Sequence, residues 1–134
     1  MALLFPAAGE VLVLNAILNK VAGQDQTLKL YKNNHTPANA DVAGTFTECT
    51  FTGYSSKSLT AANWTVTGGN PSSAAYGSAQ QFTYSGSGAS DTVYGYFVIQ
   101  TTSGTLLYAE LDPAPFTVST NGDIYQVTPA MTCT

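Results

Sequence analysis

The stretch that most constrains this fold runs from Asp91 to Leu111, DTVYGYFVIQTTSGTLLYAEL. Val, Ile, Thr and Tyr dominate it, and these residues favour a pleated strand over a helix. Gly95 and Gly104 would also interrupt a helix, whereas Ser103-Gly104 supplies the backbone freedom that a hairpin turn needs. The stretch therefore predicts two antiparallel strands joined by a turn at 101–104.

The first strand of this hairpin is apolar on both faces. Strict alternation places Val93, Gly95, Phe97 and Ile99 on one face, and Tyr94, Tyr96 and Val98 on the other. In the second strand the same rule separates Leu107 and Ala109 from Leu106, Tyr108 and Glu110. A strand without a polar face is typical of the middle of a sheet that is covered on both sides.

Before the hairpin, one segment has helical periodicity, from Gly9 to Val21. Its stripe consists of Val11, Leu14, Leu18 and Val21. Leu12 and Val13 widen the apolar face. We therefore expect this helix to be covered on more than one side, including by a partner chain.

The other segments are short, and turn residues separate them. A strand is expected at 27–32, with Leu28 and Leu30 inward and Tyr31 outward. A short edge segment is expected at 47–53, a strand or a strand pair at 57–67, and a strand at 74–84 with Phe82 inward and Tyr76 and Tyr84 opposite. The prolines of Asp112–Pro115 should end the central hairpin because they lack a ladder donor. Asn121-Gly122 predicts a final hairpin between 116–119 and 124–131.

These segments add up to seven to nine short strands after one helix. The pattern predicts a mainly β protein, an antiparallel β-sandwich or jelly-roll-like fold with one N-terminal α-helix. At 134 residues, a single domain spanning 1–134 is expected, with the N-terminal segment and helix in 1–23 and the strands in 27–134.

The charge pattern excludes several classes of partner. Only 9% of the residues are charged, against roughly 25% in ordinary soluble proteins. All four cations are lysines and the net charge is −4. Phosphate recognition depends on Arg and on clustered positive charge, so we expect neither nucleic acid nor an anionic membrane surface as partner. The sequence has no basic signal-peptide region and no apolar run of about 20 residues.

The residue types that carry catalysis or bind metals are sparse. His35 is the only histidine, and no G-x-S-x-G nucleophile motif accompanies it. Glu110 and Asp112 have the same strand parity and could form a carboxylate pair, but we favour the interpretation that both lie at a solvated strand end. Cys49 and Cys133 are consistent with one bridge or, as we favour, with two thiols. We therefore predict a protein that is not an enzyme, with no catalytic residues, metal site or cofactor.

Aromatic residues are the one surplus, with eight tyrosines and Trp64. Exposed aromatic rings such as Tyr54 and Trp64 could stack on sugars in a lectin-like module. Tyr and Trp are also enriched in protein–protein interfaces. Because Tyr94, Tyr96 and Tyr108 lie where packing would use them, we favour the protein interface.

The order of segments resembles that of a group of small tailed-bacteriophage virion proteins. The likeness covers GEVLVLNAIL, TLKLYKNNHTPANAD, FTGY, VYGYFVIQTTSGTLLYAEL and PFTVSTNGDIYQVTPAMT, which together make up most of the chain. It implies a structural protein of the particle, either a capsid decoration (cement) protein or a tail component. It implies no catalytic residue.

The resemblance and the composition together lead to one expectation and one alternative. We expect a decoration protein that is made in the host cytoplasm and located in the virion, where it binds the major capsid protein. We expect it to form a homo-oligomer, with a trimer as one option. The alternative is a receptor- or carbohydrate-binding module of a tail or fibre. The residues expected at the protein interface are Leu3, Leu4, Phe5, Leu12, Val13, Pro37 and Pro113.

Overall fold

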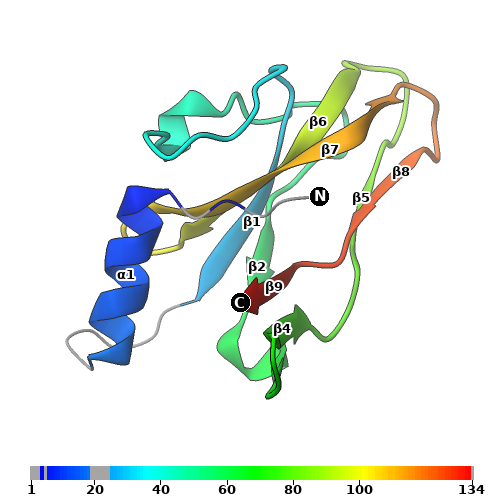
Figure 1. The fold of residues 1–134 in the computed structure, drawn as a ribbon. Coiled ribbons are helices and arrows are strands. Elements are labelled where there is room, and N and C mark those ends of the chain that lie inside the picture. The colour runs from blue at the N-terminus through cyan, green and yellow to red at the C-terminus, as the bar shows by residue number, and fades with distance from the viewer. Residues whose placement is uncertain (1–3, 5, 19–24, 134) are drawn as a thin grey trace.

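The computed structural model describes residue 4, residues 6–18 and residues 25–133. The protein is mainly β, with antiparallel sheets and one N-terminal helix, as predicted (Figure 1). Helix α1 spans Ala7–Ile17, and the predicted helical residues 19–21 lie outside the described part. The strands in the described part number nine: β1 Gln26–Tyr31, β2 Lys57–Leu59, β3 Trp64–Thr67, β4 Ser72–Tyr76, β5 Gln80–Thr83, β6 Asp91–Gln100, β7 Leu106–Val118, β8 Ile124–Val127 and β9 Ala130–Cys133.

The central hairpin is confirmed as β6 and β7. They belong to a four-stranded sheet with the order β2-β1-β6-β7. The remaining strands form a three-stranded sheet, β3-β4-β9, and a two-stranded sheet, β5-β8. The predicted single strands at 74–84 and 124–131 are each broken in two, and the N–H of Tyr76 donates to the carbonyl of Pro129 at the break (2.9 Å).

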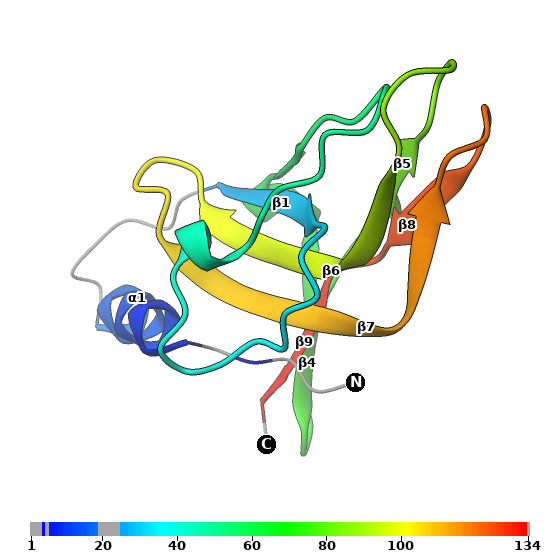
Figure 2. The same ribbon diagram turned by 90° about the horizontal axis from the view of Figure 1, so that it is seen from above.

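The four-stranded sheet is buried on both faces, as its apolar central strand predicted. One cluster, the main core, lies between this sheet and the two smaller sheets and includes Leu30, Tyr96 and Tyr108. A second core on the other face contains Tyr31, Phe46, Phe97, Leu106 and Ala109. Figure 2 shows the loop of residues 33–47, which carries Phe46, passing over this second face.

Two irregularities in the β6–β7 pairing overturn the predicted alternation. The register shifts between Val93 and Gly95 and again between Val98 and Ile99. As a result Val93 lies in the main core although Phe97 lies in the second, and Leu106 shares the second core with Ala109. A bulge adds an unpaired residue and so reverses the faces of the residues after it, which alternation alone does not reveal.

Gly95 sits at the first irregularity because no side chain fits there. A Cβ atom at this position would lie 2.1 Å from the carbonyl oxygen of Glu110 and 2.7 Å from the hydroxyl oxygen of Tyr31. That hydroxyl donates to the carbonyl oxygens of His35 and Glu110, both at 3.3 Å. The missing side chain therefore lets the Tyr31 ring enter the second core and tie the loop to β7.

Three predicted tyrosine placements are also wrong. Tyr31 was expected to point outward, but the second core encloses it completely, because the cover on that face is a tertiary feature that local alternation does not reveal. Tyr76 and Tyr84 were expected opposite Phe82, yet all three lie in the main core. Positions 76, 82 and 84 have the same parity, so alternation applied correctly places them on one face.

The expected strand end at Asp112–Pro115 is wrong, because β7 continues to Val118. β7 is an edge strand, where a proline does not remove a ladder bond that the sheet needs. The predicted last hairpin is also wrong, since β8 pairs with β5 and not with β7. Asn121 uses its side-chain oxygen to accept from the N–H of Gly86 (2.8 Å), which joins its turn to the loop after β5.

Replacing Gly95 with alanine should destabilise the fold by about 1–3 kcal/mol, because overpacking forces the backbone or Tyr31 to shift. Urea unfolding followed by Trp64 fluorescence would measure the loss. Gly44→Ala is the matched control, since a Cβ there meets nothing within 4 Å. Equal midpoints for the two variants would contradict the role given to Gly95.

Candidate interaction surface

Helix α1 approaches β7 closely through Gly9. A Cβ atom at Gly9 would lie 2.1 Å from the carbonyl oxygen of Leu107, so only glycine permits this distance. Ala8, Leu12 and Asn15 are partly buried on the same side of the helix. The N–H of Ala7 donates to the carbonyl of Asn39 (3.2 Å), which fixes the start of the helix against the 33–47 loop.

The side of α1 that faces away from the sheet carries exposed apolar residues, with the exposed Glu10 one turn before Leu14. Val11, Leu14 and Leu18 are 56%, 58% and 64% exposed. These residues form the stripe that helical periodicity singled out, but the stripe faces away from the sheet. We call these three residues the outer face of α1. Because apolar residues occur on several sides of this helix, the sequence pattern does not say which side packs, and here Gly9 decides it.

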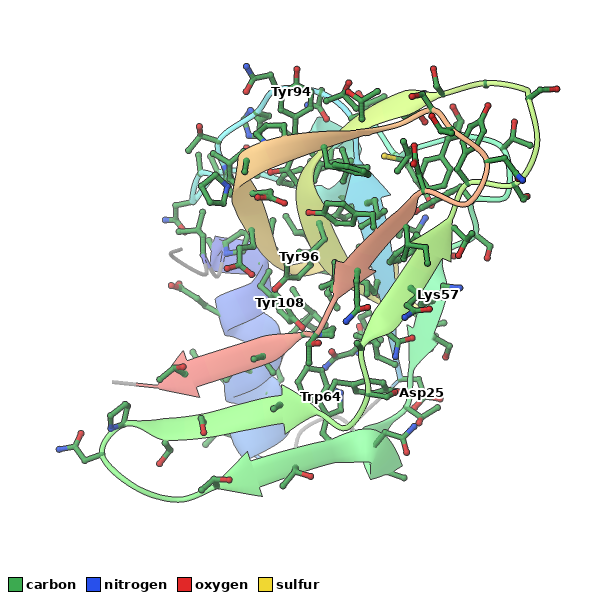
Figure 3. The ribbon with its side chains drawn as sticks, turned by 90° about the vertical axis from the view of Figure 1, so that its right-hand side faces the viewer. Asp25, Lys57, Trp64, Tyr94, Tyr96 and Tyr108 are labelled. Atoms are coloured by element: carbon green, nitrogen blue, oxygen red, sulfur yellow. The ribbon has the colours of Figure 1, made fainter. Side chains whose placement is uncertain are left out.

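A cavity of about 260 Å³ lies between α1 and the three-stranded sheet. Its wall is almost entirely apolar and includes Val13 from the helix, Val66, Ala74 and Met131 from the sheet, and Leu107 from β7. In Figure 3 the three-stranded sheet crosses in front of α1, and Tyr108, labelled above these strands, is also a lining residue. The side-chain oxygen of Gln26, another lining residue, is buried and accepts no hydrogen bond from the described residues.

The expected interface residues fall into three groups. Leu3 and Phe5 lie outside the described residues. Leu4 is partly buried, and its backbone forms an antiparallel bridge with Ala109. The others are placed as follows: Leu12 is partly buried on α1, Val13 is 39% exposed beside the cavity, Pro37 is partly buried in the loop, and Pro113 is exposed on β7.

His35 ties its loop together. Its Nε2 atom lies 2.7 Å from Oδ2 of Asp41, and that same oxygen accepts from the N–H of Ala38 (2.7 Å). The ring also packs edge-on against Phe46, with 5.5 Å between centroids. These contacts are those of a residue that holds the second core in place.

Glu110 and Asp112 accept hydrogen bonds from buried tyrosines. The hydroxyl of Tyr96 donates to the carboxylate of Glu110, and that of Tyr125 donates to Oδ2 of Asp112 (2.7 Å). The pKa of both hydroxyls is raised well above the ordinary value, mainly by burial and secondly by the hydrogen bond to the carboxylate. The two carboxylates thus anchor tyrosines of the main core to β7.

Cys49 is a free, buried thiol, and burial raises its pKa to about 12. The side chain of Cys133 lies outside the described part.

Among the described residues, no helix is long and apolar enough to cross a membrane, and no three His, Cys, Asp or Glu side chains gather as a metal site would require. No protein-family model matches the sequence, and no curated protein matches it either.

The two residues considered for sugar stacking pack against the protein. Tyr54 stacks on Phe82 with 5.7 Å between centroids, and its hydroxyl donates to Glu48 (2.9 Å). Trp64 packs edge-on against Tyr76 at 5.4 Å. The apolar stripe on α1 was visible in the sequence, but that Val11, Leu14 and Leu18 face away from the sheet was not.

Stability should fall as the pH rises above about 10, where tyrosines of the unfolded chain ionise. In the folded chain Tyr96 and Tyr125 keep their protons to a higher pH than in the unfolded chain. Their contribution to stability is therefore complete below the pKa of an unfolded tyrosine and is lost as the pH rises above that value. We expect a loss of about 1.4 kcal/mol per pH unit for each such tyrosine, measured by urea unfolding. Tyr96→Phe should reduce this slope, and an unchanged slope in that variant would contradict the assignment.

Proposed function

We propose that this chain is a structural protein of a tailed-phage virion, and specifically a capsid decoration protein that binds the major capsid protein and stabilises the shell. The observation that carries the proposal is the outer face of α1, an exposed apolar surface on a helix already fixed to the sheet. The resemblance to small phage virion proteins supplies the class of particle.

The spacing of the outer face suits a groove on a larger protein. Helices that dock in grooves use anchors at positions i, i+3 and i+7, and Val11, Leu14 and Leu18 have this spacing. Removing apolar area from water contributes roughly 25 cal/mol per Å², before the cost of ordering the partners is subtracted. Each of these half-exposed side chains would therefore contribute about 1 kcal/mol when covered.

The rest of the molecule is suited to a role of pure association. The sheet that carries α1 is packed on both faces, so the helix is presented on a rigid support. His35, Glu110 and Asp112 are engaged in holding loops and core tyrosines. In this proposal the protein works in the virion as a homo-oligomer, and it catalyses no reaction.

The alternative of a carbohydrate-binding tail module gains no support from its two candidate rings. One face of Tyr54 is covered by Phe82, and the Trp64 ring packs on Tyr76. We therefore keep the decoration protein as the proposed function.

A charge on the outer face should weaken binding to the particle. Leu14→Glu keeps a residue that favours helices but places a carboxylate where an apolar groove would close. We expect at least about tenfold weaker binding to purified heads that lack this chain, a loss of 1.4 kcal/mol or more. Quantitative co-sedimentation of heads with added protein would measure it.

Ile124→Glu is the matched control, because Ile124 is 47% exposed on β8 at the far side of the molecule from α1 (Figure 1). Thermal melts of both variants would show that the fold is retained. If Leu14→Glu bound heads as the unchanged protein does, the outer face would not be the contact surface.

A further inference from the structure

The strands of the two smaller sheets carry no charge at all. The sequence has no Asp, Glu, Lys or Arg between Lys57 and Asp91, and none after Asp123. These uncharged stretches include all of β3, β4, β5, β8 and β9. Charged side chains are among the devices by which proteins keep the open edge of a sheet from pairing with another chain, together with short edge strands, prolines, bulges and covering elements.

Strand β3 is such an open edge. Among the described strands it pairs with β4 alone, in the continuous register from Trp64 opposite Tyr76 to Thr67 opposite Ser73. No charge, proline or bulge interrupts it. Thr65, Val66 and Thr67 are exposed, and Val66 is 75% exposed.

Of the two edges of this sheet, β3 is better suited to accept a strand. Its residues are Trp, Thr, Val and Thr, all of which are favoured in strands. The opposite edge, β9, begins with Ala130 and Met131, and alanine is depleted in strands. An edge strand leaves its outward N–H and C=O groups unpaired, and another strand satisfies them in full.

We propose that β3 pairs antiparallel with β3 of a second copy of this chain, across a two-fold axis normal to the sheet. The occupant is a second copy because the edge is self-complementary. Directly opposite residues of an antiparallel pair lie on the same face of the sheet, so the axis passes beside Thr65 or beside Val66. One of the two then faces its own copy, the other faces a residue two positions away, and no like charges meet. The product is a six-stranded sheet with the order β9-β4-β3-β3-β4-β9 across the two copies.

The size of the edge determines how strong this pairing is. Four residues bury less than the roughly 1,000 Å² of a stable specific interface, even with Val66 of each copy packed against the other. The dimer should therefore be concentration-dependent. This inference deepens the proposed function by naming how copies join, but self-association is measured without any particle, so the two proposals fail separately.

Two lysine substitutions test the pairing. Val66 and Thr65 point to opposite faces of the sheet, since neighbouring residues of a strand alternate. Val66→Lys and Thr65→Lys would each place like charges across the two-fold axis, whichever face they occupy. Ala75→Lys is the matched control, because Ala75 is exposed and lies opposite Thr65, but on the central strand β4.

The measurement is the molar mass of each protein over a concentration series, by sedimentation equilibrium. We expect the unchanged protein and Ala75→Lys to shift from monomer to dimer as the concentration rises, and both β3 variants to remain monomeric. Backbone hydrogen exchange of 64–67 in the unchanged protein should also slow with concentration.

Other outcomes would overturn the inference. They are an unchanged protein that is monomeric throughout, a dimer or trimer that both β3 variants retain, or a dimer lost in Val66→Lys alone. The last result would indicate contact between sheet faces instead of strand pairing. Circular dichroism and thermal melts would check that all three variants remain folded.

Discussion

The structure depends on the burial of one strand, β6, from both sides. This strand contributes Val93, Tyr96 and Val98 to the main core and Phe97 to the second core. This division requires the bulge near Gly95, where a missing side chain lets Tyr31 reach across to the carbonyl of Glu110. If β6 were regular, the residues before Gly95 would face the wrong core, and neither cluster would be complete.

The surface features depend in turn on this doubly packed sheet. β7 lies at its edge and offers the carbonyl of Leu107 to Gly9, which holds α1 with its outer face turned away. The three-stranded sheet stands on the other side of the cavity, with β3 at its open edge. The two surfaces proposed for association, the outer face of α1 and the β3 edge, thus belong to different elements and can serve different partners.

Much of the fold was predictable from local patterns. The β6–β7 hairpin, the N-terminal helix and the number of strands follow from periodicity, turn residues and composition. The bulges were not predictable, because they depend on which neighbour occupies the space beside Gly95. The prolines of β7 misled for a similar reason, since nothing local marks a strand as an edge. Asn121-Gly122 does form a turn, but its side-chain contact with Gly86 joins it to β5.

The candidate surface was predictable only in part. Apolar contacts on α1 were predicted, but the sequence does not say which side of a helix with apolar residues on several sides the sheet covers. Leu12 and Val13 were placed at the interface, whereas Val11, Leu14 and Leu18 are the more exposed residues. The uncharged run between Lys57 and Asp91 was visible in the sequence and was the signal that could have indicated the β3 edge.

If the proposed function is right, a phage encodes this chain, and the most direct test is its copy number in purified virions of that phage. Quantitative mass spectrometry would compare its peptides with those of the major capsid protein. Our account predicts about one copy for each capsid subunit, as expected for a protein that covers the shell. Only a few copies per particle would place the chain in the tail, and its absence from purified virions would contradict a structural role altogether.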